Sequence, residues 1–306
     1  MKKKLSYVLA VTKDYMFSAG NVVLSSIKQM PKKNYDFVIF YDEILPNDRK
    51  IFEATEICKL VNYKIDENFK KNIIRFCPKF NDLLFSKYFN FIKFAKFEIF
   101  KLLDKYENIV WLDSDIAIQS DISTITNFRP FGITADESWT VQNNFTAPIK
   151  NYDMNRDGVC SAVILINDML PYEKMYDFCY KMAVECSPYY KNVDQGIINI
   201  LLQEFNITPN LMPLKDWQCI SWRKEAISAK IVHFGTNKKV WTNTNVCNSF
   251  PEWYRIHSYW LSLGGSDFDR SEIEPRNILS LLEHFDALKK QRKYKLFGIF
   301  PLNLSK

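Results

Sequence analysis

The sequence is poor in the features that mark several large classes of protein. Its 306 residues include only 8 glycines and 7 cysteines. With few glycines, no low-complexity tract and no repeat of fixed period, flexible interdomain hinges and repeat architectures are not expected. The cysteines form no Cys-x-x-Cys pair and are odd in number. This pattern argues against a disulfide or zinc framework and favours reduced thiols in the cytoplasm.

Long apolar runs are also missing. No stretch approaches the ~18 apolar residues of a transmembrane helix. The first residues, Met1-Lys2-Lys3-Lys4-Leu5, are like the basic region of a signal peptide. However, the apolar stretch Tyr7–Val11 that follows is too short to be a signal peptide's hydrophobic region. We therefore expect a cytoplasmic protein that begins with a strand at Tyr7–Val11.

What is present fits a single enzyme domain of the α/β class. The length and the 47% hydrophobic content allow a sizeable core. Strand-like and helix-like patterns alternate, which predicts parallel strands with helices on both faces and ligands at the strand carboxyl ends. The expected strands are Tyr7–Val11, Phe37–Tyr41, Ile109–Leu112, Phe131–Ala135, Ala162–Ile166 and Lys230–Phe234. The expected helices are Ser18–Lys28, Asn47–Lys59, Tyr88–Lys105, Tyr172–Glu185 and Asp194–Phe205.

Two carboxylates follow one of these strands directly. Asp113-Ser114-Asp115 comes after the apolar run that ends at Leu112. Because side chains at i and i+2 of an extended chain point to the same side, both carboxylates can face one cation. Carboxylate oxygens suit Mg²⁺ or Mn²⁺, which proteins usually hold together with the phosphates of a bound nucleotide. The motif is short and occurs by chance in many chains, so its context decides.

A second segment supplies that context. In the run Ile231-Val232-His233-Phe234-Gly235-Thr236-Asn237-Lys238-Lys239-Val240-Trp241, a strand leads to a histidine, a turn and two lysines. Neutral imidazole can be a third ligand of Mn²⁺, and lysine binds phosphate as a point charge. The alternative is a hydrogen-bonded core histidine followed by a solvated turn. The joint presence of Asp113, Asp115 and His233 favours a metal site.

Several segments, in order, resemble glycosyltransferase family 8, whose members have the GT-A fold. They are Tyr7–Tyr15, Lys96 on the helix before the Asp-Ser-Asp, Cys160-Ser161-Ala162-Val163-Ile164-Leu165-Ile166-Asn167, Asp194-Gln195-Gly196-Ile197-Ile198-Asn199, and the His233 segment. The resemblance implies a Rossmann-like, mixed and mainly parallel sheet. The chain departs from the family pattern at Thr12, Asp14, Cys160, Ala162, Gly235 and Val240.

The resemblance also implies a role for individual residues. Asp113, Asp115 and His233 would ligate Mn²⁺ or Mg²⁺, and Asp194 and Gln195 would lie beside the anomeric carbon as catalytic residues. Alternatives from the residues themselves remain, because Asp194 could only cap a helix and Lys96 could be an exposed lysine. Donor contacts are expected from Val11, Thr12, Tyr15, Lys96, Asp113, Ser114, Asp136, Cys160, Ser161, Gly235 and Lys239.

The expected reaction is transfer of a hexose from a UDP-sugar, UDP-glucose or UDP-galactose, to a saccharide or glycolipid acceptor. The family retains the anomeric configuration, and Gln195 would stabilise an oxocarbenium-like state, since a neutral amide oxygen is a poor nucleophile. The leaving phosphate could accept the proton of the acceptor hydroxyl. The lysine- and asparagine-rich composition suggests a bacterial surface glycan, such as lipooligosaccharide (lipopolysaccharide), polysaccharide or glycoprotein. The sugar and the acceptor are not encoded in any motif.

Other functions are compatible with parts of the pattern. A metal-dependent nucleotide-sugar hydrolase could use the same carboxylates, and a non-catalytic carbohydrate-binding protein could share the fold. A nucleotidyltransferase would usually carry a glycine-rich phosphate loop, but this chain has only Gly20 near its N-terminus. Nucleic acid is not an expected partner despite the net charge of +6, because no nucleic-acid-binding motif is visible.

Two regions lie outside these motifs. Residues 66–94 are rich in Asn, Lys and Phe, which fits an amphipathic helix pair or an acceptor-binding insertion. We place the GT-A domain at residues 1–265 and a C-terminal tail at 266–306. In the tail, an amphipathic helix pattern precedes a basic and aromatic stretch at 289–302, which could bind the inner membrane surface peripherally. The alternative is a terminal helix docked on the core.

Overall fold

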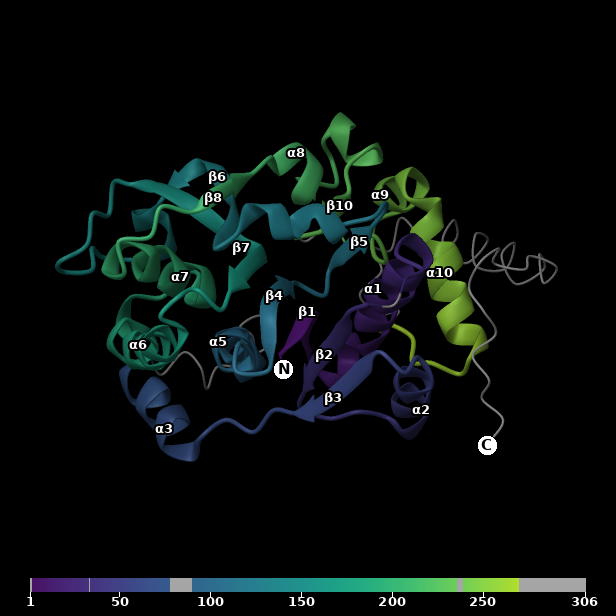
Figure 1. The fold of residues 1–306 in the computed structure, drawn as a ribbon, viewed down its shortest axis with the longest axis horizontal. Helices are drawn as coiled ribbons and strands as arrows, with labels where there is room; N and C mark the ends of the chain where they lie inside the picture. Colours follow the sequence, from purple (N-terminus) through teal and green to yellow (C-terminus); the bar gives the residue numbers. More distant parts are fainter. Residues whose placement is uncertain (1, 33, 78–89, 236–238, 270–306) are drawn as a thin grey trace. The chain divides into compact units, whose positions relative to one another are not determined.

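A computed structural model of the protein describes residues 2–32, 34–77, 90–235 and 239–269. The chain divides into two compact units, each built from segments that are not contiguous. Figure 1 shows the helices and strands, coloured along the sequence. The first unit contains residues 1–10, 62–112 and 125–214, and the second contains residues 11–61, 113–124 and 215–306. Each unit is described by itself below.

The first unit is organised around a mixed sheet. Its strands follow the order β1-β4-β7-β6-β8. β1 is parallel to β4 and β6 is parallel to β8, whereas β7 is antiparallel to both of its neighbours. The predicted mixed sheet is therefore confirmed, and β7 is its reversed strand. The strands are β1 (Lys3–Val11), β4 (Tyr106–Leu112), β6 (Phe131–Thr140), β7 (Asp157–Asn167) and β8 (Asn210–Met212).

The direction of β7 determines where its polar residues lie. Leu112 at the end of β4 pairs with Val163, and Trp111 pairs with Ile164. The beginning of β7, with Cys160 and Ser161, therefore lies at the carboxyl end of β4. A parallel β7 would have placed these two residues at the opposite edge of the sheet. Because ligands of such sheets bind at the carboxyl ends of the strands, the reversal brings Ser161 to the relevant edge.

Helices cover this sheet and pack on one another. α5 contacts β4, α7 contacts β7, and α6 packs against both α5 and α7. Phe69, Phe94, Phe97 and Tyr180 form an aromatic cluster that joins α3, η3 and α6. The helices are α3 (Glu67–Phe76), α5 (Glu98–Leu102), α6 (Tyr172–Glu185) and α7 (Val193–Glu204), with 3₁₀ turns η3 (Phe91–Phe97), η4 (Ser123–Phe128, at the unit boundary), η5 (Val141–Asn144) and η6 (Ser187–Tyr189).

In its described part, the second unit contains a small three-stranded sheet, the strand pair β3-β2 and five α-helices. In the small sheet the order is β5-β10-β9, with β10 antiparallel to β5 and parallel to β9. The strands are β2 (Asp36–Tyr41), β3 (Cys58–Asn62), β5 (Ile116–Ile118), β9 (Cys219–Ile220) and β10 (Ile231–His233). The helical elements are η1 (Lys13–Tyr15), α1 (Met16–Gln29), α2 (Pro46–Ala54), α8 (Leu214–Trp217), η7 (Lys224–Ile227), α9 (Thr244–Ser249) and α10 (Pro251–Ser262).

The core of the second unit is aromatic. Phe17 on α1 packs edge-on against Trp241 and Trp253. On α10, the fully buried Trp260 lies against Gly20 of α1 and Gly265, and a Cβ atom at either glycine would overlap its indole ring. Glycine at position 20 is therefore required by the close approach of α1 and α10 rather than by its backbone angles.

Two predicted helices were wrong in extent. The helix expected at 47–59 ends at Ala54, because Glu56 adopts a left-handed conformation with φ of 63° and β3 begins at Cys58. The helix expected at 88–105 is a 3₁₀ turn followed by the short α5, and its residues 88–89 lie outside the described part. Three phenylalanines at a spacing of three, Phe91, Phe94 and Phe97, fit the three-residue period of a 3₁₀ helix.

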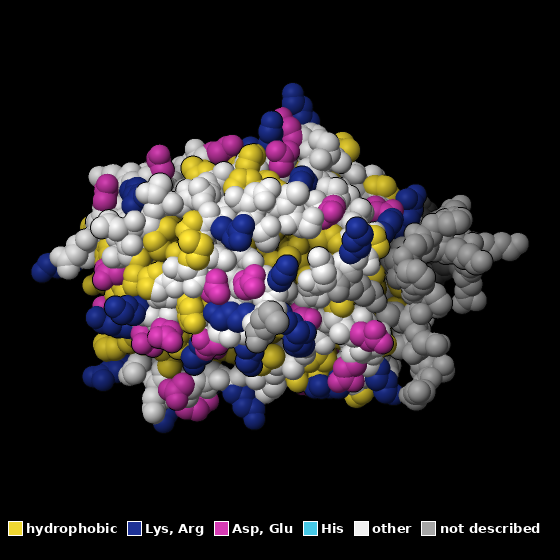
Figure 2. Space-filling view, viewed as in Figure 1, with side chains coloured by type: hydrophobic (Ala, Val, Ile, Leu, Met, Phe, Trp, Pro, Cys, Tyr) yellow, Lys and Arg dark blue, Asp and Glu magenta, His cyan; other side chains and the backbone are white. Residues whose placement is uncertain are grey.

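The structure describes parts of the two regions that lie outside the motifs, residues 66–94 and the C-terminal tail. α3 is the first helix of the expected pair, and the Asp66 side chain caps it by accepting from Phe69 N at 2.8 Å. The predicted tail helix and the basic stretch at 289–302 lie outside the described residues. No helix in the described part is both long and apolar enough to cross a membrane. On the face in Figure 2, cationic and anionic side chains are interspersed.

Candidate active site

The Asp–His cluster, which we define as Asp113, Asp115, His233 and Lys239, lies in the second unit. Asp113 and Asp115 follow β4 and precede β5, and His233 ends β10. β10 pairs antiparallel with β5, which sets His233 opposite Ile116, and Phe234 N donates to Asp115 O at 2.8 Å. Backbone pairing thus brings the histidine to the aspartates across more than one hundred residues of sequence.

The side chains of Asp113, Asp115 and His233 converge. One ligand atom from each lies within 4.8 Å of the others. This upper limit is comparable to the about 4.2 Å between opposite ligands of an octahedral Mg²⁺, and His233 Nε2 and Asp115 Oδ1 lie 3.3 Å apart. Two carboxylate oxygens and one imidazole nitrogen are donors that suit Mn²⁺ or Mg²⁺. The residues therefore fit the expected divalent metal.

Asp115 carries the strongest electrostatic interactions of this cluster. Lys239 Nζ donates to Asp115 Oδ2, and His233 Nε2 lies 3.3 Å from Oδ1. Burial alone would raise the pKa of Asp115, but the charges of Lys239 and His233 outweigh it and hold the pKa well below its ordinary value. Asp115 is therefore a carboxylate at neutral pH, which is the form that binds a cation.

Gly235 and Trp241 support this arrangement. A Cβ atom at Gly235 would overlap the His233 imidazole, so the residue must be glycine for the ring to occupy its position. Lys239 Nζ lies 6.0 Å from the centre of the Trp241 ring, and Tyr15 packs on the same tryptophan at 6.2 Å. The predicted phosphate-binding lysine and Tyr15, one of the predicted donor contacts, thus lie against one indole.

Three other predicted donor-binding residues, Val11, Thr12 and Ser114, also belong to the second unit. In the sequence they lie close to Tyr15 and to the two aspartates. Thr12 is an extended residue before η1, and its carbonyl accepts from Tyr15 N at 3.0 Å. Val11 is buried, with 2% of its surface exposed. Ser114 is partly exposed between the two aspartates.

The Lys96 cluster, which we define as Lys96, Ser161, Asp194 and Gln195, lies in the first unit. Lys96 Nζ donates to Ser161 O and Ser161 Oγ, both at 3.0 Å, and to Asp194 Oδ2. Its side chain is 3% exposed, and it also lies over the Trp111 ring at 5.1 Å. The alternative of an exposed lysine is therefore wrong. Because an ammonium has three donors, the protein already uses all of them.

Asp194 lies in the first turn of α7 but does not cap it. The N-cap residue is Asn192, which makes no side-chain cap, and the Asp194 carboxylate contacts Lys96 and Ser161 Oγ instead. Burial alone would raise the pKa of Asp194, but the charges of Lys96 and Lys93 outweigh it and lower the pKa. The positive end of the helix dipole favours the same ionised state.

The amide of Gln195 is fixed on both sides. Its Oε1 accepts from Ser161 N at 3.3 Å, and its Nε2 donates to Asn144 Oδ1 at 3.2 Å and Asp136 Oδ2 at 3.5 Å. Asp136 lies where the pairing of β6 and β7 is interrupted by a register shift, which re-aims side chains. Burial raises the pKa of Asp136. Asn144 was not predicted, because a 3₁₀ turn after β6 carries no motif.

Cys160 is partly exposed on β7 opposite Thr134. It is a reduced cysteine, as are Cys58, Cys77, Cys179, Cys186 and Cys219. The structure thus gathers the predicted residues into two groups, one in each unit. The Asp–His cluster offers oxygen and nitrogen ligands to a cation, and the Lys96 cluster presents hydrogen-bonding groups held by internal ion pairing.

Comparison with known proteins identifies the family. The model described as glycosyl transferase family 8 matches residues 6–245. The chain belongs to glycosyltransferase family 8. As a member of this family it is a glycosyltransferase, and the match covers the Asp-Ser-Asp, the Asp194-Gln195 pair and His233. A search among curated proteins finds no match.

Solved structures of other glycosyltransferases share the fold. The bifunctional glycosyltransferase WbbM is similar with a TM-score of 0.62 and 14% identity over 93% of this chain, which spans 52% of the WbbM chain. The galactosyltransferase LgtC, solved with donor and acceptor sugar analogs, gives 0.60 and 10% identity over 84% of this chain and 99% of LgtC. GlyE of Streptococcus pneumoniae TIGR4 gives 0.54 and 15% identity over 88% of this chain and 66% of GlyE. At these identities the likeness establishes the GT-A fold of this family member.

Proposed function

We propose that this family 8 glycosyltransferase moves a hexose from a UDP-sugar, UDP-glucose or UDP-galactose, to a saccharide or glycolipid acceptor in bacterial surface glycan synthesis, with retention of anomeric configuration. The observation that carries the proposal is the convergence of Asp113, Asp115 and His233, with Lys239 paired to Asp115. The likeness to LgtC, which was solved with donor and acceptor sugar analogs, supports a sugar donor and a sugar acceptor. The enzyme would act in the cytoplasm.

The Asp–His cluster is assigned the diphosphate half of the donor. Asp113, Asp115 and His233 would hold Mn²⁺ or Mg²⁺, which when bound supplies Lewis-acid neutralisation of charge on the leaving diphosphate. Lys239 would bind the same diphosphate as a point charge, and its partial exposure leaves it accessible. Tyr15 would stack on the base, with Val11 and Thr12 beside it.

The Lys96 cluster is assigned the hexose half of the donor. Asp194 is ionised and Gln195 is held by hydrogen bonds on both sides of its amide, so neither group has to reorganise during the reaction. Their role is to orient the sugar and stabilise the positive charge that develops at its anomeric carbon. The acceptor hydroxyl would transfer its proton to the leaving phosphate, which requires no protein base.

Calorimetric titration tests this proposal. UDP, GDP and a panel of UDP-sugars are titrated into the wild type and the Asp113→Ala/Asp115→Ala variant, with Mn²⁺ and with EDTA. We expect UDP binding that requires Mn²⁺ and is absent in the variant. Binding of GDP in preference to UDP would overturn the donor assignment. Binding of UDP that is unchanged by EDTA and by the double substitution would overturn the metal assignment. Release of UDP and free hexose at the same rate with and without a sugar acceptor would indicate a nucleotide-sugar hydrolase.

A further inference from the structure

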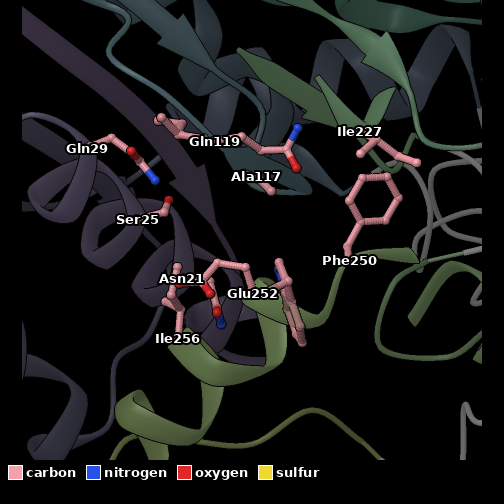
Figure 3. A pocket seen from close by; sticks show the side chains of 11 residues that line it. Asn21, Ser25, Gln29, Ala117, Gln119, Ile227, Phe250, Glu252 and Ile256 are labelled. Carbon is pink, nitrogen blue, oxygen red and sulfur yellow. The ribbon is translucent and has the colours of Figure 1, made fainter. Parts of the chain in front are cut away.

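The proposed function leaves several polar side chains without a role. Some line a cavity of about 220 Å³ in the second unit (Figure 3). Gln29 and Gln119 bring amide groups to this cavity and Phe250 brings an apolar ring, so its lining offers donors and acceptors alike and selects no class of ligand. A more specific arrangement lies in the first unit, where the side chain of Asn144 contacts Gln195.

The main chain of Asn144 docks the beginning of α7. Its carbonyl accepts from Lys191 N at 3.0 Å and from Asn192 N at 3.1 Å. A Cβ atom at Gly196 would lie 3.2 Å from Asn144 Cβ, so α7 packs closely on this segment. Gln195, one residue before this glycine, is therefore held next to Asn144.

The side chain of Asn144 has a separate set of contacts. It is fully buried, and its Nδ2 donates to Val141 O at 3.3 Å. This bond turns Oδ1 toward α7, where it accepts from Gln195 Nε2 at 3.2 Å and from Asn192 Nδ2 at 3.4 Å. Because the docking carbonyl belongs to the main chain, a substitution of the side chain removes the contact with Gln195 and keeps the docking.

These contacts determine which atom of Gln195 is available to a ligand. An amide has two N–H donors and an oxygen with two lone pairs. The Gln195 nitrogen donates to Asn144 Oδ1 and to Asp136 Oδ2. In the described part of the chain, its Oε1 accepts one hydrogen bond, from Ser161 N. A flipped amide would set its oxygen against two acceptors and its nitrogen against a donor, which is unfavourable. One lone pair of Oε1 therefore remains for a ligand.

We propose that Asn144 is a positioning residue, which orients the Gln195 amide so that it meets the donor hexose through its oxygen only. The inference rests on the proposed function, in which Gln195 lies beside the anomeric carbon. An amide oxygen carries partial negative charge and stabilises the positive charge that develops there, whereas the N–H groups would oppose it. Asn144 is 0% exposed, so it acts through Gln195 and does not touch the sugar.

A double-mutant cycle in the full chain tests this proposal. UDP release from UDP-glucose and UDP-galactose is measured with Mn²⁺ for the wild type, Asn144→Ala, Gln195→Ala and the double variant. Asn144→Ala should lower kcat about tenfold to a hundredfold. The KM for the donor should not change, because the oriented oxygen is needed only as charge develops. In the Gln195→Ala background, Asn144→Ala should cause no further loss.

Asn143→Ala is the matched control. Asn143 is exposed in the same turn, and its Oδ1 accepts from Thr140 N at 2.7 Å. This variant should keep the wild-type kcat. NMR of side-chain amides adds a measurement that does not depend on the reaction. The Gln195 Nε2 signals, identified by their loss in Gln195→Ala, should shift in Asn144→Ala and stay in place in Asn143→Ala.

Three results would overturn the proposal. They are an unchanged kcat in Asn144→Ala, an equal loss of kcat with and without the Gln195 side chain, and Gln195 amide signals that Asn144→Ala does not shift. If Asn144→Ala does not fold, Asn144→Leu, of similar volume but without a polar side-chain atom, replaces it with the same expected results. No UDP release by the wild type from any UDP-sugar would contradict the proposed function, and the amide signals then show separately whether Asn144 orients Gln195.

Discussion

Lys96 and Lys239 are each paired with an aspartate, but their ammonium groups differ in what remains available to a ligand. Lys96 is 3% exposed and donates to Ser161 twice and to Asp194 once. Lys239 is 24% exposed, and among the residues that the structure describes its only hydrogen-bond acceptor is Asp115. Two ion pairs of the same type therefore serve different purposes, since one holds protein groups in place and the other can accept a substrate.

This difference revises the expected role of Lys96. The family resemblance implied a donor contact, but a sugar hydroxyl could bind the Lys96 ammonium only by replacing one of its present acceptors. We therefore interpret Lys96 as a residue that positions Asp194 and Ser161. Substitution of the two lysines and of their aspartate partners tests the comparison, as follows from the largest expected effect to the smallest.

The largest effect is expected at Asp115, the partner of Lys239. Asp115→Asn removes the charge that both Lys239 and a divalent cation require, so metal-dependent UDP release should fall about 10³-fold. Steady-state assays with Mn²⁺ measure this loss, and Asp157→Asn, at an exposed carboxylate of β7, should keep full activity. Equal activity of Asp115→Asn and the wild type at saturating Mn²⁺ would falsify the assignment of this carboxylate.

The second effect is a loss of stability at Lys96. Lys96→Ala leaves the ionised Asp194, whose side chain is only 15% exposed, without its partner, so the free energy of unfolding should fall by about 3–5 kcal/mol. Urea denaturation of this variant and of Lys191→Ala, which removes an exposed lysine of the same unit, measures the difference. A change below about 1 kcal/mol, the range of surface pairs, would show that Lys96 is not a positioning residue.

Lys239 should show the opposite pattern. Lys239→Ala should lower UDP release about 10²-fold, because a charge on the leaving diphosphate is no longer compensated. Its unfolding free energy should change by no more than about 1 kcal/mol, because the pair is partly exposed. Lys215→Ala, at an exposed lysine of α8, is the matched control. A large loss of stability without a loss of activity would reverse the two roles.

The smallest effect concerns pH. The folded-state pKa of Asp194 is below its ordinary value of 3.8, so the ionised carboxylate stabilises the fold above pH 3.8. This contribution is lost as the pH falls from 3.8 through the lower folded-state pKa. Between these limits the stability of the wild type should fall by up to about 1.4 kcal/mol per pH unit more than that of Asp194→Asn. Parallel slopes of the two proteins in urea denaturation between pH 2.5 and 5 would contradict this expectation.

The sequence predicted elements best where one pattern was sufficient. The helix at Tyr172–Glu185 has the predicted bounds because its apolar period is regular over its whole length. β3 was missed because the helical pattern continued past Thr55, and only the backbone conformation of Glu56 ends α2 there. The reversed direction of β7 was not predicted either, since strand direction depends on pairing partners that are distant in sequence.

The candidate site shows the same contrast between residues that a sequence pattern identifies and residues that only the fold brings together. Asp113, Asp115 and His233 were predicted because metal ligands are few, chemically distinctive and located at strand ends. Asn144 was not predicted, although it accepts a hydrogen bond from Gln195. It acts through another side chain, and no residue type or spacing in the sequence identifies such a residue. The saturated ammonium of Lys96 likewise depends on three acceptors that only the folded chain assembles.

The tryptophan between Gly20 and Gly265 restricts the order in which this chain can change during evolution. A larger residue at position 20 or 265 would overlap the Trp260 indole, so either change first requires a smaller side chain at position 260. Replacement of Trp260 alone would leave a large void in the aromatic core. Related sequences in which one of these three positions has changed are therefore expected to have changed at the other two as well.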